Sequence, residues 1–120
     1  MSKIFINFSN LHTNKWPEDR LQGAREIADG GEIINMAFPI LSPQVSKEDV
    51  YTQAEISVEK IMEHNPDVVF CQGEFSLCFR IVELLKEKGI KVVTVCNERV
   101  ISNVDGRQFP EFKFIQFREF

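Results

Sequence analysis

Apolar and polar residues alternate with two different periods along this chain, and the alternation predicts strands and helices in turn. Short apolar runs at residues 3–8, 32–37, 67–72 and 90–96 have the length and composition of buried strands. Between them, apolar residues recur every three or four positions after Pro17, after Ser46 and after Gly73, as they do in amphipathic helices. Strands that alternate with helices in this way indicate βαβ units and a mainly parallel sheet.

Local signals mark the ends of the expected helices. Pro17 suits the first helical position, and Ser46 with Asp49 resembles a capping box. Asn65 before Pro66 stops the second helix, and Gly89 stops the third. The third helix is expected to turn five residues inward: Phe75, Cys78, Ile81, Val82 and Leu85.

The pattern changes after residue 96. The dipeptide Asp105-Gly106 is a strong hairpin signal, and it lies between apolar residues 100–101 and 112–117. The last two strands are therefore predicted to be antiparallel, with the final strand at the sheet edge. Two right-handed crossovers place the first strand centrally, in the order 2-1-3-4. We expect a single domain over residues 1–120, a Rossmann-like or flavodoxin-like three-layer α/β sandwich.

Composition and charge narrow the function classes. A chain of 120 residues can bury a core without disulfides. Its net charge of −4 argues against a genomic DNA partner, because such binding depends on clustered Lys and Arg. No apolar run reaches the length of a membrane span, and the N-terminus lacks a signal-peptide pattern. We expect a cytoplasmic protein without a membrane partner.

The cysteines and histidines do not predict a metal site. Cys71, Cys78 and Cys96 lie in apolar stretches and have neither zinc-site spacing nor the pairing of a disulfide framework. They are expected to be core thiols. His12 and His64 are too few and too far apart to predict a metal centre. No metal and no cofactor is therefore expected.

Polar residues cluster where the predicted strands end. Ligands of open α/β sheets bind outside the carboxyl ends of the strands, where the strand order reverses. The candidate site comprises Asn7, Ser9, Asn10, His12 and Lys15 after the first strand, Gln72, Gly73, Glu74, Phe75 and Ser76 after the third, and Asn97 and Arg99 after the fourth.

These residue types suit an anionic or nucleotide-like ligand. Free N–H groups at residues 74–76 would favour a phosphate, and Lys15 and Arg99 could neutralise charge. Gln72 offers both a donor and an acceptor, and the pKa range of histidine suits His12 for proton transfer. Purely structural roles are also open: Ser9 can satisfy backbone groups at the strand end, as can Asn7, and Glu74 can simply stabilise the helix end.

Trp16 is expected to pack the first loop onto the domain rather than to stack on a base. Several familiar motifs are missing. The chain has no G-x-G-x-x-G after the first strand, no G-x-x-x-x-G-K-[ST] and no G-x-S-x-G. A conventional dinucleotide site, a P-loop NTPase and an α/β-hydrolase are therefore not predicted.

Two short motifs carry a resemblance to a known family. The strand end Asn7-Phe8-Ser9-Asn10 and the turn at residues 67–74, DVVFCQGE, resemble those of small Rossmann-like proteins encoded beside type III CRISPR systems. Those proteins are related to CARF domains, and several are ring nucleases that cleave cyclic oligoadenylate. Related small members have a motif similar to N-F-S-H, so Asn10 stands where they have histidine, and His12 follows two residues later.

The resemblance implies a homodimer that binds a cyclic oligoadenylate across its two-fold axis. It also implies cleavage without metal, by attack of a ribose 2′-hydroxyl on the adjacent phosphate. Ser9, Asn10 and residues 74–76 would position phosphates, and Ser9, His12 and Lys15 are the candidate catalytic residues.

Two alternatives remain from the residues alone. One is a nucleoside deoxyribosyltransferase-like enzyme that uses Glu74 as its nucleophile. The other is a non-catalytic dimeric ligand-binding or interaction domain that pairs through its Phe-rich final strand, with Phe114 at the contact.

Overall fold

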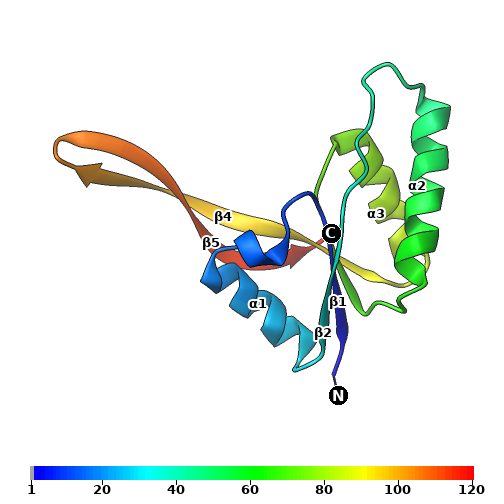
Figure 1. The fold of residues 1–120 in the computed structure, drawn as a ribbon, viewed down its shortest axis with the longest axis horizontal. Helices are drawn as coiled ribbons and strands as arrows, with labels where there is room; N and C mark the ends of the chain where they lie inside the picture. Colours follow the sequence, from blue (N-terminus) through cyan, green and yellow to red (C-terminus); the bar gives the residue numbers. More distant parts are fainter. Residues whose placement is uncertain (1) are drawn as a thin grey trace.

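One five-stranded sheet organises the chain, with the strand order β2-β1-β3-β4-β5. The computed structural model describes residues 2–120 (Figure 1). Strands β1 to β4 are parallel, and β5 is antiparallel to β4. The strands are β1 (Ile4–Phe8), β2 (Glu32–Met36), β3 (Val68–Cys71), β4 (Lys91–Val104) and β5 (Arg107–Glu119). The helices are η1 (Thr13–Lys15), α1 (Glu18–Ala28), α2 (Lys47–Met62) and α3 (Phe75–Glu87).

Helices cover the sheet on both sides. One core lies under α1, where Ala24 and Ala28 pack with Phe5, Phe70 and Val93. The other core lies under α2 and α3, against residues that alternate with these along the same strands: Ile6, Val69 and Val92. The central strands are thus buried on both faces, as parallel strands are in α/β folds. The predicted three-layer α/β sandwich is confirmed, including the strand order and the antiparallel edge strand.

The predicted capping box at Ser46 and the predicted helix end at Gly89 are borne out. The Ser46 hydroxyl oxygen accepts a hydrogen bond from the Asp49 N–H, and the Asp49 carboxylate accepts one from the Ser46 N–H, so the capping box is present. Gly89 has a φ of 78°, the left-handed conformation that ends α3. Pro17 caps α1 rather than occupying its first position.

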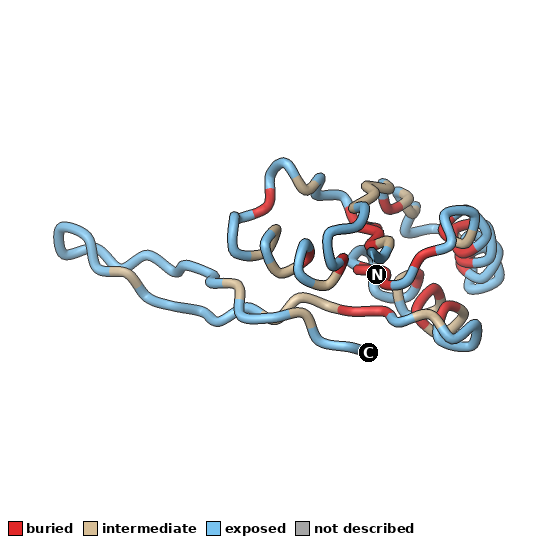
Figure 2. The backbone as a smooth tube through the Cα atoms, turned by 90° about the horizontal axis from the view of Figure 1, so that it is seen from below, coloured by how far each residue is buried: buried red, intermediate tan, exposed pale blue. Residues whose placement is uncertain are grey.

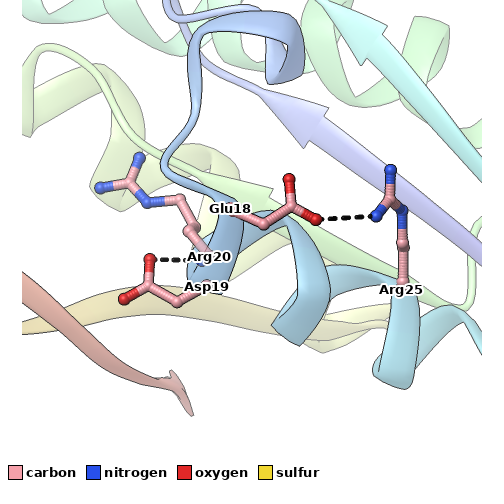
Figure 3. Close-up of polar contacts among 4 residues, drawn as sticks. All are labelled: Glu18, Asp19, Arg20 and Arg25. Atoms are coloured by element: carbon pink, nitrogen blue, oxygen red, sulfur yellow. Dashed lines mark hydrogen bonds and ion pairs between the residues drawn. The ribbon is translucent and has the colours of Figure 1, made fainter.

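Charged residues of α1 make two short-range polar contacts (Figure 3). Glu18 and Arg25 form an ion pair at 3.3 Å, and the Arg20 N–H donates to the Asp19 carboxylate at 2.8 Å. The Arg20 guanidinium lies over the Trp16 ring, 5.2 Å from its centroid, and burial lowers the pKa of Arg20. Exposed pairs of this kind contribute little stability. Every helix within residues 2–120 is too short or too polar to cross a lipid bilayer.

Two expectations about the elements are wrong. Strand β4 does not end at Cys96 but continues to Val104. Phe75 does not face inward: it is 91% exposed. The reason is that α3 begins at Phe75, beyond the last residue of β3, Cys71, so no strand lies there to cover the ring.

The outer parts of β4 and β5 form a two-stranded arm that leaves the body (Figures 1 and 2). Asp105 and Gly106 at its tip have φ values of 52° and 74°, as a tight hairpin turn of the expected kind requires. Figure 2 shows the arm exposed along most of its length, whereas the buried residues gather in the body.

A β-bulge marks the root of this arm. Cys96 pairs with Gln116 and Asn97 pairs with Phe114, so Ile115 is the extra residue. In a regular strand, Phe114 and Phe117 would point to opposite faces. The bulge instead brings them to the same face, with ring centroids 5.1 Å apart. They lie against Gly23 of α1, where an added Cβ would be 3.0 Å from the Phe114 ring.

Candidate functional site

Two asparagines in neighbouring strands form the polar base of the carboxyl edge. Asn7 and Asn35 are in register, and Asn7 Nδ2 donates to Asn35 Oδ1 and to the Leu11 carbonyl, both at 2.8 Å. Asn35 accepts from the Thr13 N–H and donates to Thr13 Oγ1, both at 3.0 Å. Asn7 is 1% exposed, so its side chain shapes the loop from beneath. Asn35 was not among the predicted residues, although a polar residue inside an apolar strand was a visible signal.

Ser9 belongs to the same network. Its hydroxyl donates to Asn7 Oδ1 at 2.6 Å, and its oxygen accepts from the Leu11 N–H at 3.3 Å. Ser9 is buried, yet it lines two small pockets above the sheet. The serine proton is committed to Asn7, so chemistry at this hydroxyl would first have to break that bond.

Trp16 fixes the far end of the loop. Its indole Nε1 donates to the Leu11 carbonyl at 3.0 Å, and its ring packs edge-on against Phe70 with centroids 5.5 Å apart. The expected packing role of Trp16 is confirmed, because the residue is buried in the core beneath α1. The Leu11 carbonyl thus accepts from Asn7 and from Trp16, which fixes the path of the loop between them.

His12 is exposed and lines the smaller of these pockets. The Asn14 N–H donates to His12 Nδ1 at 3.1 Å. The neutral ring therefore carries its proton on Nε2, which makes Nε2–H a hydrogen-bond donor and leaves Nδ1 occupied as an acceptor. Lys15 is also exposed, and it forms no ion pair with any residue from 2 to 120.

The exit of β3 passes close to the loop after β2. The backbone N–H of Gln72 donates to the Phe8 carbonyl at 3.2 Å. The Gln72 side chain is exposed. At Gly73, an added Cβ would lie 2.4 Å from the ring of Phe38. Phe38 is itself held against Phe8, with ring centroids 5.3 Å apart. Only glycine fits this turn.

The carboxylate of Glu74 caps the start of α3. Glu74 accepts from the Ser76 N–H at 3.1 Å and from the Leu77 N–H at 2.8 Å. The Ser76 hydroxyl also donates to it. These hydrogen bonds, first that of the Leu77 N–H, lower the pKa of Glu74. A phosphate at this helix end would have to displace an ionised carboxylate, so the capping role of Glu74 accounts for the geometry.

The expected contribution of the fourth strand rested on a strand end that does not exist. Asn97 lies at the bulge, and Arg99 lies on the arm opposite Phe112. Val93 is level with Phe70 of β3, and Arg99 follows it by six residues. Gln72 lies two residues beyond Phe70, so at about 3.3 Å per residue Arg99 lies four residues, roughly 13 Å, farther along the sheet than Gln72. The structure therefore does not bring Arg99 to the edge with Ser9 and Gln72.

Two pockets that share Ser9 and Asn10 lie at the switch point between β1 and β3, and Lys15 lines neither of them. One pocket of about 210 Å³ is lined by Ser9, Asn10 and His12, and a second of about 290 Å³ by Ser9, Asn10, Gln72 and Gly73. Asn10 and Gln72 are exposed, and no side-chain hydrogen bond within residues 2–120 holds either amide. We call these two joined pockets the edge groove.

A larger, mainly apolar pocket of about 670 Å³ adjoins the edge groove through Gln72 and Gly73. It runs along α3, and we call it the α3 groove. Its lining includes the exposed rings of Phe75, Phe79 and Phe120. Phe75, predicted as a ligand contact, therefore lies on this side and not in the edge groove.

Two thiols also line the α3 groove. Cys71 Sγ and Cys78 Sγ are 3.3 Å apart. The contact with Cys78, together with burial, raises the pKa of the Cys71 thiol, whereas the hydrogen bond from Cys71 lowers the pKa of Cys78. Cys78 is thus the more acidic member of the pair. In the described part of the chain, no three His, Cys, Asp or Glu side chains are grouped to hold a metal ion.

Comparison with known proteins supports the fold and identifies the family. The structure is similar to that of the S. aureus MnaA-UDP co-structure, with a TM-score of 0.50 and 16% sequence identity. The match covers 79% of this chain but 29% of that one, and at this identity it shows the fold alone. Curated protein sequences give no match. The sequence profile of the Uncharacterized protein MJ1673 family matches residues 3–118, and the chain therefore belongs to the MJ1673 family.

Proposed function

We propose that this protein binds a nucleotide in the edge groove, and that the nucleotide is a cyclic oligoadenylate. The observation that carries the proposal is the pair of exposed amides, Asn10 and Gln72, which face a groove at the switch point of the sheet without partners in the described residues. Asn and Gln side chains match the donor and acceptor of an adenine edge. The similarly folded MnaA was solved with UDP, which supports a nucleotide on this scaffold.

The phosphates would lie toward the loop after β1. His12 offers Nε2–H there as a donor, and Lys15 lies three residues farther along the same loop and η1 helix. Neither depends on the α3 helix end, which Glu74 already occupies. A ligand with several phosphates also suits a two-fold arrangement, as the resemblance to the CARF-related proteins implies.

Cleavage is the second step of the proposal. The ribose 2′-hydroxyl would give its proton to water as its oxygen bonds to the adjacent phosphorus, the P–O5′ bond would break, and the 5′-oxygen would keep the electron pair and take up a proton from water. The products would be a 2′,3′-cyclic phosphate and a free 5′-hydroxyl. His12 and Lys15 would stabilise the charge that develops on the phosphate oxygens. Ser9 would act indirectly, by holding Asn7 and the loop.

Calorimetric titration with cyclic tetra-adenylate, cyclic hexa-adenylate and UDP tests binding. We expect a cyclic oligoadenylate to bind, and Asn10→Ala and Gln72→Ala each to weaken it roughly ten- to a hundredfold. Gln53→Ala, an exposed amide on α2 outside the groove, is the matched control and should leave affinity unchanged. Binding of UDP alone would refute the cyclic ligand, and no binding of any of the three would refute the nucleotide proposal.

Cleavage is tested separately, by chromatography of the bound nucleotide after incubation with a metal chelator. A linear product bearing a 2′,3′-cyclic phosphate is expected, and His12→Ala and Lys15→Ala should slow its formation more than they weaken binding. If the bound ring stays intact, the cleavage proposal is refuted and the binding proposal stands.

A further inference from the structure

The arm presents apolar side chains that nothing in its own chain covers. We define the arm as residues 98–113, the part of the hairpin beyond the bulge. Because paired residues of a hairpin share a face, the register assigns the arm two faces. One face carries Ile101 and Phe112 among Arg99, Asn103, Gln108 and Pro110, and the other carries Val100, Val104 and Phe109 among charged residues and Ser102. Phe112 is 70% exposed, and Ile101, Val104 and Phe109 are exposed as well.

A ribbon of this kind needs a partner. Two strands alone are at best marginally stable in water, because neither face is packed. Here large apolar side chains lie on both faces, so covering one face would still leave the other exposed. A two-faced apolar ribbon is suited to insertion against another molecule.

The same chain has a second unpartnered apolar surface, the α3 groove. Phe75, Phe79 and Phe120 line it with Val82 between them, and all three rings are exposed. The arm cannot fill this groove in its own molecule. Figure 1 shows the arm projecting away from α3, and its strands run continuously out of the sheet without a flexible break.

We propose that the arm of one copy packs into the α3 groove of a second copy, and that the contact is reciprocal. A reciprocal contact of this kind closes a two-fold dimer and covers the α3 groove and one face of the arm in each chain. The proposal does not rest on the proposed nucleotide, because neither a ligand nor a residue of the loop after β1 takes part in the contact.

The exposed area is sufficient. Taking about 200 Å² for a phenylalanine side chain, Phe112 on one face of the arm and the three rings of the α3 groove present roughly 540 Å² per copy. Together with Ile101 on the same face of the arm, two copies contribute roughly 1,200 Å², which reaches the lower limit of specific stable interfaces, about 1,200 Å² in total.

The charges of the arm favour a second copy over a nucleic acid. Residues 98–113 contain three basic and three acidic side chains, and the whole chain has a net charge of −4. An arm without net positive charge is unsuited to phosphate backbones, whose binding depends on clustered Lys and Arg. Arm and groove each mix charged side chains with apolar ones, and the groove contributes Glu83 and Lys86.

Sedimentation equilibrium of the full chain, without ligand, tests the interface. The wild-type protein is expected to be a dimer. Phe112→Glu on the arm and Phe79→Glu in the groove should each give a monomer. Both side chains are well exposed, so neither substitution disturbs the core, and circular dichroism should be unchanged. Ile56→Glu, on the exposed part of α2 outside both surfaces, is the matched control and should remain a dimer.

The possible outcomes separate the parts of the proposal. A wild-type monomer at every concentration tested would overturn it entirely. A dimer that Phe112→Glu disrupts but Phe79→Glu does not would overturn docking in the α3 groove, and would indicate pairing through the β5 edge instead. Loss of dimerisation in both variants, with the control intact, supports it.

Discussion

Gly73 shows how tightly single residues are constrained at the edge groove. The β3–α3 turn passes over the Phe38 ring, which Phe8 supports from below. An added methyl group would meet that ring at 2.4 Å, and the buried ring has little room to move. Because Gly73 has no side chain, the turn can pack directly against Phe38 of the loop after β2.

We expect Gly73→Ala to lower the free energy of unfolding by about 1–3 kcal/mol, the usual cost of overpacking. Urea denaturation measures this. The neighbouring Gln72→Ala is the control, because Gln72 is exposed, and it should change stability by less than about 0.5 kcal/mol. If the two substitutions change the free energy of unfolding equally, the turn can move to accommodate a Cβ and the overpacking account is wrong.

The candidate site was only partly predictable from these residues. Polar residues after β1 and β3 are visible in the sequence, and Ser9, Asn10, His12, Gln72 and Gly73 do meet at one groove. Their partners are not visible, because hydrogen bonds such as that between Asn7 and Asn35 depend on strand register. The sequence alone could not show that Asn7 would be buried while Asn10, three residues later, would be exposed.

Among the elements, α3 depends on a carboxylate for its first turn. Glu74 satisfies the N–H groups of Ser76 and Leu77, which would otherwise lack partners inside the helix. Since these bonds favour the ionised form, they lower the pKa of Glu74 in the folded state. The stabilisation is present above the unfolded pKa, about 4.3, and is lost as the pH falls through the lower folded pKa.

Glu74→Ala should therefore destabilise the protein by about 1 kcal/mol at neutral pH, the usual loss for a helix cap. The difference from wild type should shrink as the pH falls from the unfolded pKa, about 4.3, through the lower folded pKa of Glu74, because the carboxyl of the wild-type protein becomes protonated there. Thermal unfolding across this pH range measures the difference. Glu55→Ala, an exposed residue of α2, should show no such difference. A difference for Glu74→Ala that stays constant with pH would contradict the capping account.

The elements of the body and the hairpin turn of the arm were predictable, but the continuation of β4 past Cys96 was not, for one physical reason. Helix caps and buried strands follow local rules, as Ser46 and the apolar run of β3 illustrate. Beyond Cys96, β4 enters solvent, so the alternation that burial imposes disappears at Asn97, Glu98 and Arg99. Cross-strand pairing with β5 keeps these residues extended, and that pairing leaves no periodic signal in the sequence.

At the scale of the whole molecule, the edge groove and the α3 groove share Gln72 and Gly73. An arm docked in the α3 groove would therefore hold the Gln72 turn from the side opposite the nucleotide. We expect ligand to strengthen dimerisation by about fivefold or more, and monomeric Phe112→Glu to bind ligand correspondingly more weakly. Sedimentation with and without ligand measures the first effect, and calorimetry of the variant measures the second. Equal affinities in monomer and dimer would show that the two surfaces act independently.

The overall shape reflects this division between body and arm. The molecule measures 51 × 43 × 22 Å. The buried core of residues 2–120 lies within the three-layer body alone. Gly23 and the paired rings of Phe114 and Phe117 fix the root of the arm against α1. The direction of the arm is therefore set by the body, while its length is set by the hairpin alone.

The bulge at Ile115 makes that length adjustable. It completes the contact with α1 at Phe114, so residues nearer the tip take no part in the body. Adding or removing two residues in each strand would keep every side chain on its present face and move the tip by about 7 Å. If the arm docks on a second copy as proposed, the length of the hairpin would set the spacing between the two molecules without altering either fold.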